Sequence, residues 1–169
     1  MKLSRLMGLA MLCMVSQVLA EEKNGLRLTA QKTVLERDKD RDAFYMWDKV
    51  DKALGLKVSA KNVSFKEMPE GTLEYTVVVR RWGHSPTLYH RYTGTEKLPA
   101  LKTGGSADLT TGKVKMGGWE SSGNRKQFQD SLEGWEIVVK HGGLETIRLT
   151  STADFAKLNA KAKPGPKQD

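Results

Sequence analysis

Cysteine is almost absent from this chain of 169 residues, since the single example is Cys13. Cys13 belongs to an N-terminal apolar run that we expect to be removed, and no cysteine follows it. Disulfide bonds, thiolate catalysis and zinc–thiolate sites are therefore excluded for the rest of the chain. Packing and hydrogen bonds alone must hold the fold together, and the length suits one domain.

The N-terminal apolar run is short for a permanent membrane anchor. Lys2 and Arg5 precede it, and it covers Leu6–Leu19. A helix that crosses a bilayer needs roughly 20 apolar residues. A basic start, a shorter apolar centre and small residues before the cut are typical of a secretory signal. We interpret residues 1–20 as a signal peptide cleaved after Ala20, which predicts an extracytoplasmic protein that is periplasmic, on the outer surface or secreted.

Acidic residues are fewer than basic ones, with 20 Asp and Glu against 28 Lys and Arg and a net charge of +8 at pH 7. An excess of this kind favours anionic partners such as acidic glycans. Two of the positive charges belong to the predicted signal peptide, and four lysines lie in the last thirteen residues. We interpret the excess as a solubilising surface and tail, and we expect no nucleic-acid partner.

Short β-favouring runs separated by turn residues fill the chain from residue 54 to 150. The clearest run is Leu73–Trp82, in which every second residue from Leu73 to Val79 is apolar. Two further runs, at residues 134–140 and 144–150, flank a pair of glycines, which predicts a tight hairpin. The pattern predicts a mainly β protein with an antiparallel β-sandwich body over residues 54–150.

The segment before the predicted body carries a mixed signal. Residues 21–53 predict an N-terminal strand near 25–35, then a charged loop at Arg37–Arg41 and a short helix. The helix is expected from apolar residues that recur at helical spacing, namely Phe44, Trp47, Val50 and Leu54.

The segment after the predicted body indicates a C-terminal helix over residues 151–163. Ser151 and Asp154 have the spacing of a capping box, and apolar residues follow at helical intervals. Two prolines flank a glycine directly afterwards, so residues 164–169 are expected to form a disordered tail.

Three aspartates, Asp38, Asp40 and Asp42, alternate as they do in a calcium-binding loop. The glycine that such a loop needs at its sixth position is replaced by Ala43, and the bidentate glutamate at its twelfth position is replaced by Lys49. We therefore predict a solvated charged loop, with no metal site and no cofactor.

Motifs of known catalytic chemistry are also lacking. The three histidines, His84, His90 and His141, fall in different predicted elements, and His90 shares a face with apolar neighbours, which predicts a partly buried, hydrogen-bonded side chain. The chain has no nucleophile elbow, phosphate-binding loop or suitable acid pair. We predict that the protein is not an enzyme; an active site built from residues distant in sequence is the alternative. Asn62-Val63-Ser64 matches a glycosylation acceptor, to which we attach no function.

Basic and aromatic residues concentrate in two runs that we expect to pair as neighbouring strands. Arginine forks bind carboxylate, sulfate or phosphate, and exposed rings provide platforms for sugars or peptides. The alternative is structural, with Trp82 and Trp135 inside the sandwich and arginine stems covering its rim. The predicted binding residues are Arg80, Arg81, Trp82, His84, Tyr89 and Arg91, together with Trp119 in a loop rich in Ser and Asn.

The stretch Leu56–Trp82 resembles the second and third strands of bacterial and archaeal immunoglobulin-like adhesion domains. The likeness rests on Val58, on Lys61-Asn62, on Pro69 and on the alternating strand that starts at Leu73. The cysteine pair of antibody domains is missing. After residue 20 the chain also resembles secreted immunoglobulin-like proteins linked to type IV pilus gene clusters of mucin-dwelling bacteria. This resemblance implies a pilus-associated or host-contact role and supplies no catalytic residue.

Together these patterns predict an immunoglobulin-like β-sandwich that serves in surface attachment or in an envelope or pilus-associated assembly. The expected contact surface is an unpaired sheet edge or the face from Arg80 to Arg91, and the expected partner is an envelope or surface protein. A homo-oligomer is compatible with the same edges. The alternative function is an extracytoplasmic binding domain for acidic glycans or other polyanions.

Overall fold

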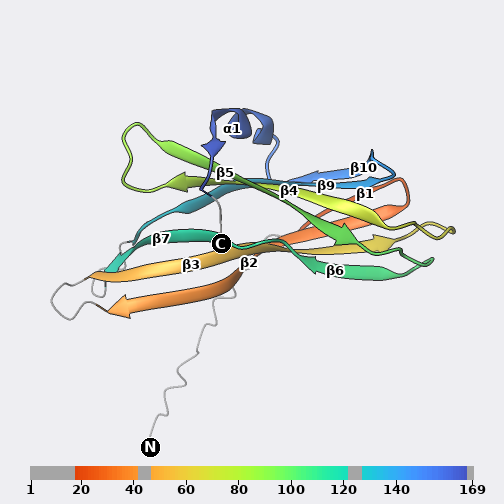
Figure 1. The fold of residues 1–169 in the computed structure, drawn as a ribbon, viewed down its shortest axis with the longest axis horizontal. Coiled ribbons are helices and arrows are strands. Elements are labelled where there is room, and N and C mark those ends of the chain that lie inside the picture. The colour runs from red at the N-terminus through yellow and green to blue at the C-terminus, as the bar shows by residue number, and fades with distance from the viewer. Residues whose placement is uncertain (1–17, 42–46, 122–126, 167–169) are drawn as a thin grey trace, which may run out of the picture.

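The computed structural model describes residues 18–41, 47–121 and 127–166, most of which belong to two largely antiparallel sheets. The first sheet has the order β1-β2-β3-β7-β8, with β6 also paired to β3, and the second has the order β10-β9-β4-β5-β11. Figure 1 shows the two sheets stacked as layers, which confirms the predicted β-sandwich. The strands are β1 Leu19–Lys23, β2 Leu26–Arg41, β3 Trp47–Asn62, β4 Gly71–Arg81, β5 Leu88–Leu98, β6 Ser106–Thr110, β7 Val114–Ser121, β8 Gln127–Gln129, β9 Ser131–His141, β10 Leu144–Thr150 and β11 Lys163–Pro164.

The core lies between the two sheets and is built from every second residue of the central strands. Leu56 and Val58 of β3 face Leu73 and Val79 of β4, and Ile137 of β9 joins the same buried cluster. Side chains on a strand alternate between its two faces, so a period of two directs one apolar set inward. Burying one side chain of this size stabilises the folded state by about 1.5–3 kcal/mol.

The long strands β2 and β3 correct the prediction for the segment before residue 54. The charged run Arg37–Arg41 continues β2 instead of forming a loop, and residues 47–53 belong to β3 instead of a helix. Along β3 the buried Asp48 and Val50 alternate with exposed residues, which is the period of a strand. Pairing with β2 on one side and β7 on the other overrides the helical spacing. Phe44 and Asp42 lie outside the described residues.

Asn62, at the end of β3, holds the β3–β4 connection in place. Its Nδ2 donates to the carbonyl oxygens of Lys66 at 2.7 Å and Leu101 at 3.1 Å. Its Oδ1 accepts hydrogen bonds from Ser64, at 2.9 Å from the backbone nitrogen and 2.7 Å from the hydroxyl. Because Asn62 is fully buried, the Asn62-Val63-Ser64 motif serves as a structural anchor in this fold.

The C-terminal helix α1, Phe155–Lys161, confirms the predicted helix but not its predicted cap. The Ser151 hydroxyl accepts a hydrogen bond from the Trp135 backbone at 2.7 Å, and the Asp154 side chain makes no capping hydrogen bond. Phe155 and Ala162 pack on Val78, so α1 covers the outer face of the second sheet, as Figure 1 shows.

The chain stays ordered beyond α1, which corrects part of the predicted tail. Lys163 and Pro164 form β11, which pairs in parallel with His90 and Arg91 of β5. The backbone nitrogen of Gly165 then donates to the carbonyl oxygen of Arg91 at 2.8 Å. Residues 167–169 lie outside the described part.

Two hairpins close on left-handed turn residues. In the predicted β9–β10 hairpin, Gly142 and Gly143 have φ of 57° and 81°, a conformation that glycine adopts readily. The β1–β2 hairpin turns at Asn24 and Gly25.

β1 begins at Leu19, so the cut expected after residue 20 falls inside this strand. Among the described residues, no helix has the length and hydropathy to cross a membrane.

Candidate binding site

Asp130, between β8 and β9, fixes the end of β4 against the first sheet. Its Oδ2 accepts hydrogen bonds from the Arg81 guanidinium and from the Gly117 backbone at 3.0 Å. Its Oδ1 accepts from the Trp82 backbone at 2.9 Å. Arg81 also contacts the Tyr92 hydroxyl and lies 5.6 Å from the centroid of that ring. The Arg81 and Asp130 side chains are only 16% and 10% exposed, so water screens this ion pair little.

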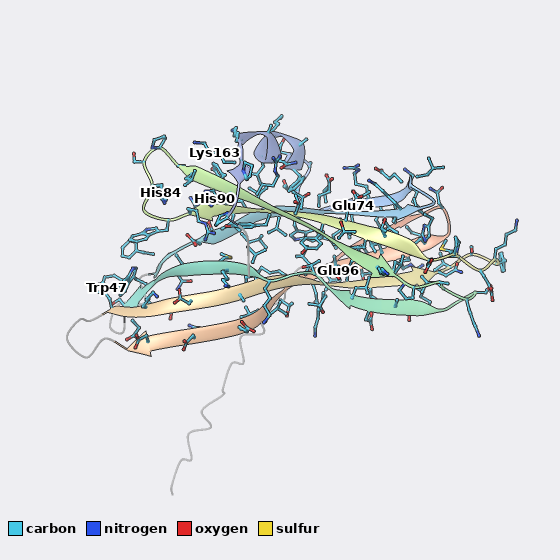
Figure 2. All side chains as sticks on the ribbon, viewed as in Figure 1. Trp47, Glu74, His84, His90, Glu96 and Lys163 are labelled. Carbon is cyan, nitrogen blue, oxygen red and sulfur yellow. The ribbon has the colours of Figure 1, made fainter. Side chains whose placement is uncertain are left out.

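The Asp130 contacts place Trp82 in a row of aromatic side chains at one end of the sandwich. The Phe128 ring lies 5.3 Å from Trp82 and 5.2 Å from Trp47, measured between centroids and with tilted planes. Trp119 stands opposite Phe128 in the β7–β8 ladder. Trp82, Trp119 and Phe128 are 46%, 38% and 38% exposed. We call these four rings the aromatic end, and Figure 2 shows Trp47 and His84 there.

A cleft of about 710 Å³ lies on the same strands as the aromatic end. Arg81 forms part of one wall and Pro166, after β11, forms another. Three carboxylates and four cations line the cleft, so its charge is mixed. These charged residues are Glu36, Asp38, Asp51, Arg37, Lys52, Arg81 and Lys115.

Ion pairs already occupy several cations of the cleft. Arg37 lies 2.9 Å from the Glu120 carboxylate, and Lys52 lies 3.6 Å from its other oxygen. Arg81 is paired with Asp130. A cation held by a carboxylate must be separated from it before it binds another anion, which reduces the gain from that anion. The cleft is therefore poorly suited to a polyanion.

Two buried carboxylates, those of Asp48 and Glu120, lie on the face of the first sheet opposite the aromatic rings. Lys39 is 2.7 Å from Asp48, and the Gln129 amide donates to Glu120 at 2.7 Å. Burial raises the pKa of Glu120, but the hydrogen bond from Gln129 and three neighbouring cations outweigh burial and lower that pKa. Both carboxylates belong to a network of ion pairs and hydrogen bonds that links β2, β3, β7 and β8.

The predicted cluster of basic and aromatic residues does not form one surface. Arg80 lies on the outer face of β4 and is 3.1 Å from the Glu133 carboxylate. Tyr89 packs against the α1 cluster, and Arg91 donates to the Asn159 side chain at 3.4 Å. The alternation of β4 and the position of α1 divide the cluster, so the face from Arg80 to Arg91 is not a continuous contact surface.

Of the predicted binding residues, Trp82, His84 and Trp119 remain together at one end of the molecule. Trp119 lies in β7 and not in a loop, and its ring is exposed as expected. The structural alternative places both Trp82 and Trp135 inside the sandwich. Trp135 is buried there, whereas Trp82 is exposed. The residues that sequence reasoning missed are Trp47, Phe128 and Asp130. The last two lie in or beside a strand of three residues, which is too short to show a pattern.

The histidines occupy separate environments. His90 Nδ1 lies 3.4 Å from the Arg81 guanidinium, and burial together with this charge lowers its pKa. His141 Nδ1 lies 2.7 Å from the Thr146 hydroxyl, and burial lowers the pKa of His141. Within residues 18–41, 47–121 and 127–166, no three His, Cys, Asp or Glu side chains group as metal ligands.

Comparison with known proteins gives only distant structural likeness. No protein-family model and no curated protein matches the chain. The X-ray structure of a Northeast Structural Genomics Consortium target is 7% identical with a TM-score of 0.36, over 76% of this chain and 86% of that one. A crystal structure from Akkermansia muciniphila is 13% identical with a TM-score of 0.32, over 80% and 75%. Likeness at this level supports no argument about function, so the resemblances stated above stay predictions.

Proposed function

We propose that the protein is an exported, non-enzymatic attachment module that binds its target through the aromatic end. The observation that carries this proposal is the joint exposure of Trp82, Trp119 and Phe128, which are in contact or paired across strands. Soluble proteins rarely expose several large apolar side chains side by side. An exposed apolar patch of this kind is typical of an interaction site. The resemblance to immunoglobulin-like adhesion domains supports the same role.

The charges around the rings favour an uncharged target over a polyanion. Lys49, the cation opposite Trp119, lies 2.9 Å from the Asp51 carboxylate. Asp38 and Asp40 lie on the same side of the sheet, because their ladder partners are Asp51 and Lys49. An anionic glycan at this end would meet these carboxylates. A neutral surface glycan, whose sugar rings stack on aromatic faces, fits the surface better, and we propose it as the target class.

A glycan array of neutral, sialylated and sulfated glycans tests the proposal. We expect the wild-type protein to bind neutral glycans, and Trp82→Ala and Trp119→Ala each to weaken this binding by about tenfold, as expected for the loss of one stacked ring. Phe65→Ala is the matched control, since Phe65 is an exposed ring in the β3–β4 connection, beyond the end of β3 that lies away from Trp47. Thermal unfolding of each variant checks that the fold is retained.

The array also separates the two candidate functions. Binding restricted to sialylated or sulfated glycans, and lost as salt rises, would contradict the proposal and support the polyanion alternative. Equal losses in Phe65→Ala and Trp82→Ala would show that the aromatic end is not the contact surface.

A further inference from the structure

The outer edge of β2 is a second interaction surface, separate from the aromatic end. β2 pairs with β3 along nearly its whole length, but β1 covers only Leu26–Ala30. Residues 31–41 have no strand on their other side among the described residues. At about 3.3 Å per residue this edge is roughly 36 Å long. Outward N–H and C=O groups of a sheet edge form a template for another strand. In this edge the Lys39 N–H already donates to the Asp38 carboxylate at 2.8 Å, and the β2–β3 register shifts between Val34 and Glu36.

The hydrogen bonds around Leu56 show which backbone groups of the edge are free. Leu56 is the ladder partner of Lys32, yet its N–H donates to the Thr111 hydroxyl at 2.9 Å and its C=O accepts from the Thr111 backbone at 3.0 Å. In an antiparallel pair of strands, directly opposite residues alternate between two kinds. Residues of one kind exchange backbone hydrogen bonds, and those of the other direct their N–H and C=O groups away from each other. The backbone of Lys32 therefore faces outward, and by the period of two so does that of Val34.

Three acidic side chains of the edge lie on one face. Glu36 is paired with Lys113, whereas Asp38 and Asp40 have no ion pair among the described residues. The ladder partners of Asp38 and Asp40 are Asp51 and Lys49, and the Lys49 ammonium is taken by Asp51 at 2.9 Å. Within the described part of the chain, neither Asp38 nor Asp40 has a cationic group within ion-pair distance. Lys49 also interacts electrostatically with Asp40 and Asp38, so three carboxylates share its charge and this part of the edge carries a net negative charge.

Basic side chains of the edge lie on the other face, where Arg37 and Lys39 are paired with carboxylates and Lys32 is exposed. Arg37 is 2.9 Å from Glu120, and Lys39 is 2.7 Å from Asp48. A strand added to this part of the edge thus meets a net negative charge at Asp38 and Asp40 on one face, and the ion-paired Arg37 and Lys39 on the other. Opposite charges placed across two strands stabilise the pair, and like charges destabilise it.

We propose that the β2 edge binds an extended segment of a partner protein that carries basic side chains at alternate positions and small uncharged ones between them. A second copy of this chain is a poorer occupant in the antiparallel arrangement. Two antiparallel β2 edges would be related by a twofold axis perpendicular to the sheet, which leaves the acidic faces of both copies on the same side. Asp38 and Asp40 of one copy would then stand opposite acids of the other. The proposal rests on the edge alone and not on the aromatic end.

Peptide titration tests the charge pattern. The probe is a labelled nine-residue peptide of alternating threonine and lysine, titrated with purified protein and followed by fluorescence anisotropy. We expect the double variant Asp38→Asn/Asp40→Asn to weaken binding by about threefold to thirtyfold, the range for two exposed charge pairs. Asp108→Asn, an exposed acid on β6, is the matched control and should change nothing. Equal binding of a peptide with the same residues in block order would overturn the proposal.

Backbone probes test whether the peptide adds as a strand. Val34→Pro removes an outward N–H and should weaken binding at least tenfold, whereas Val34→Thr keeps that N–H and should bind normally. In the wild type, the peptide should slow amide exchange of Lys32 and Val34 but not of Thr33, which bonds to β3. Unchanged exchange, or normal binding by a folded Val34→Pro variant, would overturn the proposal.

Two further measurements separate this site from other interpretations. Trp82→Ala should leave peptide binding unchanged, so failure of the glycan proposal does not affect this one. Sedimentation of the wild-type protein should show a monomer at the concentrations of the titration. A dimer that Val34→Pro dissociates would overturn the proposal, because it would identify a second copy as the occupant.

Discussion

At the scale of single residues, Asp130 connects the two sheets beside the aromatic end. It accepts hydrogen bonds from Arg81, Trp82 and Gly117, which come from both sheets. The Arg80–Glu133 pair next to it is more exposed and lies on the outer face. Arg80 and Arg81 are adjacent residues of β4, so a solvated ion pair can be compared there with one that is shielded from water.

We expect Asp130→Asn to lower the free energy of unfolding by about 2–4 kcal/mol, because Arg81 would lose its counter-charge in a site shielded from water. Glu133→Gln should cost under about 1 kcal/mol, as is usual for an exposed pair. Urea denaturation of both variants measures the difference. Equal losses would contradict the assignment of Asp130 as the joint between the sheets.

The carboxylate of Glu120 should make stability depend on pH. Its pKa in the folded protein lies below its ordinary value of 4.5, with burial opposed and outweighed by Gln129 and nearby cations. A carboxylate of this kind stabilises the fold above its unfolded pKa, and the contribution is lost as pH falls through the folded pKa. The stability difference between wild type and Glu120→Gln should be largest at neutral pH and shrink below about pH 4. A difference that stays constant from pH 7 to pH 3 would contradict this.

At the scale of elements, α1 depends on its contact with the second sheet. It has seven residues, and an isolated helix of that length does not persist in water. Phe155 is buried against Val78, and a Cβ added at Gly134 would approach the Phe155 ring to 3.2 Å. Gly134 therefore leaves room for the helix to pack closely.

Phe155→Ala should destabilise the protein by about 3–5 kcal/mol, the usual cost of removing a buried phenylalanine. Because β11 follows α1 directly, the amide of Gly165, which bonds to the Arg91 carbonyl, should exchange faster in this variant. Lys157→Ala, at an exposed position of α1, is the control and should change both quantities little. Hydrogen exchange and urea denaturation provide the measurements.

The elements that sequence reasoning predicts correctly are those whose signal is local. The alternation from Leu73 to Val79 defines β4, and Gly142 and Gly143 define the β9–β10 turn. The run Arg37–Arg41 carries no local strand signal, because Arg37 and Lys39 are paired with carboxylates on β7 and β3 that only the folded sheet brings near. Trp47 and Val50 fit both a helix and a strand, and the sheet decides between them.

At the scale of the whole molecule, the candidate site depends on contacts between distant parts of the chain. The sequence predicts Trp82 as a binding residue because it belongs to a concentration of basic and aromatic residues, and Trp119 because it lies in a stretch rich in Ser and Asn. Trp47 and Phe128 become part of the site only because β4 and β8 belong to different sheets that meet there. A single sequence carries no signal for such proximity, so the predicted cluster combines Trp82 with arginines that the fold places on other surfaces.

Fluorescence of the four tryptophans can distinguish the core from the aromatic end. Trp135 is 5% exposed in the core, whereas Trp82 and Trp119 are among the exposed large apolar residues. We expect acrylamide to quench most of the tryptophan emission and to leave one protected, blue-shifted component. Trp135→Phe should remove that component, while Trp82→Phe should reduce only the accessible one. If Trp82→Phe instead removes protected emission, the ring of Trp82 is buried in solution and the attachment surface proposed here does not exist.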